Sequence, residues 1–419
     1  MQVPPPPPPS GGVPIFVPSP PPWPPPPPHI RAYSARTNRS WEDIPFSDNP
    51  DTDDAGERAR QESRKRIRQA IGAVIGSNQL AALLGLGCSA GVNGPKMSDL
   101  WLRVRHHNPV LFRTMQARVG DTTPDSLTGD IEQFLTRCQI LANTPLAADP
   151  NARTFISSAE AVISEACRMF LDYADLSDHA HCLRILSRRS PEKPRTRLFT
   201  TNYDLCIETA AAQSGVLIID GFGRETPPTF DGIHFDIDFV RRRVESKSPE
   251  YLDGVVHLVK LHGSVDWART ESGQVIRSEK PEAPVIIYPR SDKFELSYRQ
   301  PFLEMMSQFH TLLRQSDLGL LIVGFGFSDA HLSETILGAI RKNLSLRVVI
   351  ATLNCQQHCD PNDPMYRPTL GLLKRLADQG DSRVLLLDCS FSDFVRLIPH
   401  AGTETEEDRL RNAIRTLVK

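Results

Sequence analysis

The sequence predicts an α/β protein with a Rossmann-like, mostly parallel sheet, helices on both faces, and an α-helical insertion. Short, continuously apolar segments recur in the second half of the chain and alternate with helical periodicity, which is typical of buried parallel strands. From about residue 98 to 190 helical periodicity dominates instead, which indicates the insertion. The 419 residues are 40% hydrophobic and 23% charged, as in a globular protein.

Three parts are expected along the chain: a Pro-rich N-terminal arm (1–49), a main domain (50–400) and a C-terminal helix (401–419). Sixteen of the 36 prolines lie in the first 28 residues. Proline runs donate no backbone hydrogen bonds, so we expect a disordered arm. The alternative is a docking segment with Phe16 and Trp23 as anchors for an aromatic-lined groove.

The elements of the main domain follow from periodicity and from apolar runs. A helix over Asp54–Ile75 leads into a first strand, Gln79–Leu84. The insertion holds helices at Asp130–Leu141 and Arg153–Tyr173, and Ser98 is expected as the N-cap of its first helix. The later strands are expected at Arg197–Thr200, Val216–Ile219, Val256–Leu261, Val285–Tyr288, Leu318–Val323, Leu346–Ala351 and Val384–Leu387. The later helices are expected at Leu205–Gln213, Pro301–Gln315, Ala330–Lys342 and Pro368–Asp378.

The overall charge and the cysteines restrict the class of protein. The formal net charge is -2 with both signs interspersed, so we do not expect direct nucleic-acid binding. The N-terminus does not resemble a signal peptide and no apolar run approaches about 20 residues, which predicts a cytoplasmic protein without membrane contact.

The eight cysteines are scattered, as in a reducing compartment. Cys355, His358 and Cys359 suggest zinc, but no second ligand pair has suitable spacing, so no metal is predicted.

Two stretches place polar side chains just after buried strands, where open α/β sheets bind ligands. The first, Phe199–Asp204, offers Asn202 and Asp204; the second, Lys260–Ser264, offers His262. An amide can orient a hydroxyl or a water, a carboxylate stabilises positive charge, and an imidazole is the usual general base. Structural alternatives remain: a turn-forming Asn202, an Asp204 that caps the next helix, and a purely structural His262.

Two glycine-rich loops support this site. In the loop after the first strand, Gly85, Gly87 and Ser89 would let the backbone approach a pyrophosphate, although a simple strand-to-helix turn is equally consistent. In the loop 323–329, Gly324 and Gly326 allow close approach, and Ser328 or Asp329 either caps the following helix or binds a hydroxyl. Farther along the chain, Asn354 is a candidate for an adenosine ribose.

In this order, Thr-Thr-Asn-Tyr-Asp, Lys-Leu-His-Gly-Ser and Gly-Phe-Gly-Phe-Ser-Asp resemble the sirtuin-like NAD hydrolases of bacterial anti-phage defence, over roughly residues 71–398. The resemblance implies that NAD is the substrate, that Asn202 and His262 are catalytic, and that Asp204 assists. It implies a cofactor-binding role for the residues of the two glycine loops, which are Gly85, Gly87, Ser89, Gly324, Gly326 and Ser328. Thr201 and Asn354 are expected to be further cofactor contacts. Leu86, where the family commonly has alanine, is a mild departure.

The resemblance also implies an activity and its control. Sirtuin deacylases carry two Cys-x-x-Cys pairs for zinc, which this chain lacks, so water rather than acyl-lysine is the expected acceptor. Cleavage of the bond between nicotinamide and ribose would then give ADP-ribose. The alternatives are an NAD-dependent protein deacylase and a nonhydrolytic NAD or ADP-ribose sensor. Because NAD loss is toxic, the family implies gating, through a homo-oligomer or a HerA-type ATPase partner.

Overall fold

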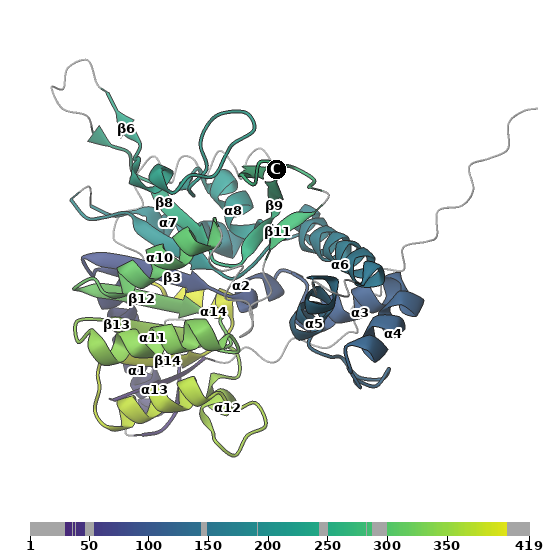
Figure 1. Ribbon diagram of the computed structural model, residues 1–419. Helices are drawn as coiled ribbons and strands as arrows, with labels where there is room; N and C mark the ends of the chain where they lie inside the picture. The colour runs from purple at the N-terminus through teal and green to yellow at the C-terminus, as the bar shows by residue number, and fades with distance from the viewer. Residues whose placement is uncertain are drawn as a thin grey trace, which may run out of the picture.

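The chain folds into a three-layer α/β domain with a helical module at one side (Figure 1). The computed structural model describes residues 30–35, 37, 39–46, 54–143, 149–190, 192–242, 250–281, 283–286 and 300–399. The expected fold class is confirmed: a large, mostly parallel sheet is covered by helices on both faces.

The main sheet has nine strands among the described residues. In spatial order they are β2 (Glu42–Asp43), β1 (Arg31–Ser34), β14 (Val384–Asp388), β13 (Arg347–Thr352), β12 (Leu318–Val323), β3 (Gln79–Leu84), β4 (Thr196–Thr200), β8 (Val255–Lys260) and β5 (Leu217–Ile219). All pairings from β14 to β5 are parallel, whereas β1 and β2 are antiparallel. The chain leaves β3 on one side through β4 and later returns to its other side through β12. Open α/β sheets bind ligands where strand order reverses in this way.

The central strands carry apolar side chains on both faces of the sheet, and helices bury both faces. One face packs against α1 (Ala55–Ile75), α7 (Ser177–Ser187), α8 (Cys206–Ser214) and α14 (Phe391–Leu397). The other face packs against α10 (Phe302–Leu313), α11 (Ala330–Lys342) and α13 (Pro368–Asp378). On this second face the rings of Phe199 and Phe309 meet edge to face, 4.8 Å apart. Two apolar layers therefore fix the sheet from which the site residues project.

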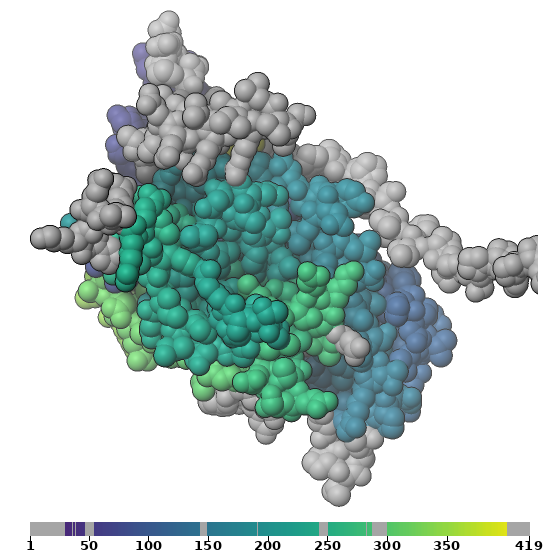
Figure 2. Space-filling view, turned by 90° about the horizontal axis from the view of Figure 1, so that it is seen from above, coloured from purple at the N-terminus to yellow at the C-terminus, as the bar shows by residue number. Residues whose placement is uncertain are grey.

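The insertion forms a helical module of α3 (Met97–His107), α4 (Pro109–Arg118), α5 (Ile131–Asn143) and α6 (Pro150–Met169). Its core is aromatic: Trp101, Phe112, Phe134 and Phe155 form successive ring contacts. The same apolar cluster includes Tyr203, Val265 and Ile286 of the sheet domain. The module, blue in Figure 2, therefore shares a core with the sheet domain rather than standing apart from it.

A small antiparallel sheet begins beside the candidate histidine. It is made of β10 (Val275–Arg277), β9 (Gly263–Arg269) and β11 (Pro284–Ile286). Gly263 has φ +87°, and a Cβ there would lie 2.1 Å from the carbonyl oxygen of Val285. Only glycine fits this conformation and this close approach. A separate two-stranded ribbon pairs β6 (Val240–Arg241) with β7 (Glu250–Tyr251).

Most predicted elements appear within a few residues of their expected bounds. The C-terminal end of the strand predicted at Val285–Tyr288 lies outside the described residues, as does the helix predicted at 401–419. The expected boundary of the N-terminal arm is wrong, because residues 31–34 form a strand that lies between β2 and β14 and pairs with both. Ser98 is not an N-cap, since α3 begins at Met97 and Lys96 precedes it. Within the described ranges, no helix is both long and apolar enough to cross a membrane.

Candidate active site

The two predicted motifs meet at one edge of the sheet. Strands β4 and β8 are parallel neighbours, and their last residues, Thr200 and Lys260, are partners in register. The N–H of Leu261 donates to the carbonyl of Thr200 at 2.8 Å, which extends this pairing past the strand ends. Asn202 and His262 each follow two residues later. Because parallel neighbours lie about 4.8 Å apart, the two residues reach the same edge of the sheet although 60 positions separate them in sequence.

The amide of Asn202 connects this strand end to Gly85, which follows β3, and to the short helix α2 (Leu86–Ala90) that begins after it. Its Nδ2 donates to the carbonyl of Gly85 at 3.1 Å and to the hydroxyl of Ser89 at 2.8 Å. Its backbone N–H donates to Oγ1 of Thr200 at 3.0 Å, the local turn that the sequence allowed. The Oδ1 atom takes no hydrogen bond within the described part of the chain. Asn202 therefore forms the local turn through its backbone and still has an acceptor oxygen available on its side chain.

Asp204 is buried behind Asn202 and is shared between two loops. Its Oδ2 accepts from the hydroxyl of Ser89 at 2.7 Å, and its Oδ1 accepts from the N–H of Cys206 at 3.0 Å. The capping alternative holds in modified form, since Leu205 is the N-cap of α8 and Asp204 stands one residue earlier. Ser89 is itself only 1% exposed. Its hydroxyl serves Asn202 and Asp204, so its role toward a pyrophosphate stays a prediction.

His262 is paired with a carboxylate from a distant loop. It is 6% exposed, and its Nε2 lies 3.2 Å from Oδ2 of Asp329. Asp329 also caps α11, where its Oδ1 accepts from the N–H of Leu332 at 3.1 Å. Burial acts to raise the pKa of Asp329, but the hydrogen bond and charge of His262, together with the Leu332 N–H, lower it overall. An ionised Asp329 therefore orients the imidazole.

The loop that carries Asp329 passes over the middle of the site. It begins at the end of β12, and two strands, β3 and β4, separate β12 from β8. To reach His262 it crosses the ends of both strands, where the glycine loop and Asn202 lie. Within it, Phe327 has φ +54°, an uncommon conformation for a bulky residue. Such strained positions cluster at functional sites.

The glycines of the two loops pack against each other. Gly87 donates its N–H to the carbonyl of Gly324 at 2.8 Å, and Gly85 donates to the carbonyl of Val323 at 2.9 Å. Gly324 has φ +65°, and a Cβ there would lie 2.6 Å from the backbone nitrogen of Cys88. A Cβ at Gly326, by contrast, would meet nothing within 4 Å. Loop packing thus explains Gly85, Gly87 and Gly324, whereas a side chain at Gly326 would point into open space.

The sequence of this region matches one family model. Residues 196–370 match the sequence model of a family described as the SIR2-like domain. The chain contains a SIR2-like domain. The matched segment includes Asn202, His262 and Asp329, whereas the loop after β3 and the helical module precede it.

Solved Sir2 structures are also similar to this chain. One is a mutant Sir2 homologue in complex with 2'-O-acetyl ADP-ribose, at 14% identity and a TM-score of 0.36, covering 75% of this chain and 94% of the other. Another is a Sir2 homologue in complex with NAD, at 13% identity and a TM-score of 0.35, covering 84% and 94%. None of the curated proteins searched matches the chain.

A buried ion pair of the SIR2-like domain, between Lys260 and Glu208, contacts the backbone of the Asn202 turn. Nζ of Lys260 donates to the backbone carbonyl of Asp204 at 2.5 Å and to Oε1 of Glu208 at 2.9 Å. Burial acts to lower the pKa of Lys260, but the carboxylates of Glu208, Asp266 and Asp204 raise it overall. Sequence reasoning missed this pair. The signal was a lysine at the end of an otherwise apolar strand, where a charge requires a partner.

The remaining candidates of the SIR2-like domain lie along the same sheet edge. Thr201 is part-buried beside Asn202, and Ser328 is exposed on the loop after β12. Asn354 follows β13 and is exposed, with φ +59°. Their roles as ligand contacts stay predictions.

The cysteines near Asn354 do not form a metal site in the described residues. Cys355 and Cys359 are buried free thiols on α12 (Cys355–Cys359). Across the described ranges, no group of three or more His, Cys, Asp or Glu side chains is placed to hold a metal ion.

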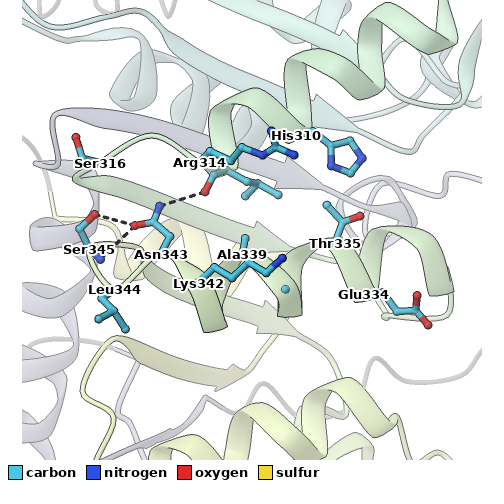
Figure 3. Close-up of a pocket in the computed structure, with 12 residues that line it drawn as sticks. His310, Arg314, Ser316, Glu334, Thr335, Ala339, Lys342, Asn343, Leu344 and Ser345 are labelled. Carbon is cyan, nitrogen blue, oxygen red and sulfur yellow. Dashed lines mark hydrogen bonds between the residues drawn. The ribbon is translucent and has the colours of Figure 1, made fainter.

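A hollow of about 800 Å³ lies away from this site (Figure 3). Its lining combines cationic side chains of α10 and α11, such as Arg314 and Lys342, with residues before β12 and β13 such as Ser316 and Ser345. The amide of Asn343 links the ends of the two helices by donating to the carbonyls of Leu313 and Gln315. The hollow therefore opens at the amino ends of the strands, opposite the candidate active site.

Proposed function

We propose that this protein is an NAD+ glycohydrolase, which cleaves the bond between nicotinamide and ribose to give nicotinamide and ADP-ribose. One observation carries the proposal: Asn202 and His262 stand on register-matched ends of neighbouring strands, beside the loops at the reversal of strand order. The match to the SIR2-like family supports NAD as the substrate. The lack of Cys-x-x-Cys pairs in the sequence supports water as the acceptor.

In the proposed reaction, water adds to C1' of the nicotinamide ribose. The bond from C1' to the pyridinium nitrogen breaks, and its electron pair neutralises nicotinamide as it leaves. His262 accepts the proton of the attacking water or of a ribose hydroxyl, and Asp329, 3.2 Å away, stabilises the imidazolium that forms. The free Oδ1 of Asn202 orients the water or the ribose. Asp204 is buried, and its charge acts through Ser89 and the Asn202 turn.

The binding of NAD is assigned to the loops that border these groups. Gly326 has room for close approach of a ligand, and Ser328 and Thr201 lie beside it along the edge. The pyrophosphate is assigned to the loop after β3, with Gly85, Gly87 and Ser89, and the adenosine ribose to Asn354. The resemblance of the motif loops supports the pyrophosphate assignment, and the position of Asn354 after β13 supports the ribose assignment.

We further propose that the activity is a gated effector that depletes NAD in the cytoplasm during anti-phage defence. The resemblance of the motifs carries this context, with a homo-oligomer or a HerA-type ATPase as the trigger. Size measurements in solution, with and without such an ATPase, test it: a monomer that hydrolyses NAD at full rate would contradict gating by assembly.

The first experiment separates hydrolysis from deacylation. Purified protein is incubated with NAD, with and without an acyl-lysine peptide, and nicotinamide and ADP-ribose are quantified. Equal amounts of both products without peptide support the glycohydrolase. Release that requires the peptide and yields acylated ADP-ribose supports the alternative, an NAD-dependent protein deacylase. NAD binding without release would instead make the chain a sensor.

A further inference from the structure

The helical module contributes a carboxyl group to the neighbourhood of the site. Glu132 lies in the first turn of α5. The hydroxyl of Tyr203 donates to its Oε1 at 3.2 Å. Tyr203 stands between Asn202 and Asp204, so this hydrogen bond joins the module to the turn that carries both candidate residues.

Tyr203 is itself a rigid link between the module and the sheet domain. It is 5% exposed and belongs to the apolar cluster of the module. Its carbonyl accepts from the N–H of Val265 at 3.1 Å, two residues beyond Gly263. A displacement of Tyr203 would therefore move the Asn202 turn and the strand that follows His262 together.

The charges around Glu132 are those of the candidate site. Burial raises the pKa of Glu132 to about 7; His262 and the Tyr203 hydroxyl oppose this rise, and Asp130 and Asp329 add to it. These groups come from four places in the fold: the residue before α5, the Tyr203 turn, the segment after β8 and the cap of α11. Glu132 thus lies within electrostatic reach of both His262 and Asp329.

We propose that Glu132 is a positioning residue of the active site: it holds Tyr203, and through it the Asn202 turn, and its negative charge stabilises His262 as it takes up a proton. The inference rests on the proposed function. It makes the helical module part of the catalytic unit, since docking of α5 completes the site. Below about pH 7 Glu132 takes up a proton, its charge is lost, and turnover falls.

The test uses Glu132→Gln, which keeps an acceptor for Tyr203 but removes the charge. The matched control is Glu165→Gln, on the exposed side of α6 in the same module. Thermal unfolding is measured at about pH 5.5 and about pH 8. An acid with a raised folded pKa stabilises the fold at low pH and loses that contribution as the pH rises. The Tm of Glu132→Gln minus that of the wild type should therefore be larger at about pH 8 than at about pH 5.5. For Glu165→Gln this difference should not change with pH.

The kinetic half of the test follows NAD cleavage across the same pH range. Glu132→Gln should lose about 10-fold in kcat with KM unchanged, because the imidazolium of His262 loses a neighbouring negative charge, and it should lose the inflection near pH 7. Wild-type kinetics in Glu132→Gln would overturn the positioning role. If the Tm difference between Glu132→Gln and wild type is the same at both pH values, the raised pKa of Glu132 is contradicted. A wild type that cleaves no NAD would instead overturn the proposed function, which the Tm measurement does not need.

Discussion

His262 and Asp329 form a buried pair across the candidate active site, with Nε2 and Oδ2 3.2 Å apart. They come from loops whose strands are separated by β3 and β4, and the pair therefore encloses the ends of these two strands. A carboxylate that fixes an imidazole and stabilises its protonated form is the arrangement expected of a general base. The pair assigns two tasks to Asp329: it orients His262 and it caps α11.

Asp329→Asn separates these two tasks. Asparagine is as good an N-cap as aspartate, so α11 and the Tm should be preserved. The loss of the negative charge beside His262 should reduce NAD cleavage by about 10²-fold or more, because the imidazolium is no longer stabilised. Steady-state kinetics and thermal unfolding check the two halves. Asp329→Asn with wild-type turnover would show that the pair is structural only.

Gly324 and Gly326 provide a matched pair of substitutions. Gly324→Ala places a Cβ 2.6 Å from the backbone of Cys88 at a positive φ, and should destabilise the fold by about 2–4 kcal/mol. Gly326→Ala meets nothing within 4 Å and should leave stability unchanged, but it should weaken NAD binding if the ligand lies against this loop. Chemical unfolding and NAD titration distinguish the two variants. Equal stability losses in both would contradict the packing described for the loops.

Lys260→Met tests the buried ion pair below the Asn202 turn. It leaves Glu208 without its cation and the carbonyl of Asp204 without its donor. Breaking one side of a buried pair costs about 3–5 kcal/mol. Urea unfolding should show this loss, and the double variant Lys260→Met with Glu208→Leu should recover part of it. A double variant no more stable than the single one would mean that Lys260 acts through Asp204 alone.

We expect protonation of His257 to lower the free energy of unfolding at acid pH. Burial lowers the pKa of His257 to about 4. The charges of Arg197 and Arg195 also lower it, whereas those of Asp238 and Asp236 raise it. The unfolded chain takes up this proton at higher pH than the folded one, so stability is present above about pH 6.5 and is lost toward pH 4, by up to about 3 kcal/mol. His257→Gln should flatten this dependence in urea unfolding between about pH 7 and pH 4.5. A variant that keeps the wild-type slope would refute the assignment.

The main sheet could be predicted because its strands are continuously apolar. Runs such as Leu318–Val323 are buried on both faces, and this composition is specific to covered parallel strands. The shared edge for Asn202 and His262 followed from the same rule. The strand Arg31–Ser34 was missed because the preceding segment is Pro-rich, and its pairing with β2 and β14 is a long-range contact that the sequence does not show.

The unpredicted parts of the site depend on contacts between distant segments. Asp329 was seen as a cap, since nothing in the sequence shows that its loop crosses two strands to His262. Ser89 was assigned to a ligand, yet its burial behind Asn202 gives its hydroxyl an internal role. Glu132 belongs to a helix whose periodicity reveals its buried face but not the site against which that face docks.

The central claim is that Asn202 and His262 perform NAD cleavage, and nicotinamide release by matched variants tests it most directly. Wild type, Asn202→Ala, His262→Ala and the exposed control His107→Ala are compared with NAD alone, each after its fold is verified by thermal unfolding. The account predicts stoichiometric nicotinamide and ADP-ribose from wild type and control, and a loss of about 10²–10⁴-fold in the two site variants. Folded Asn202→Ala and His262→Ala proteins that release nicotinamide at the wild-type rate would contradict it.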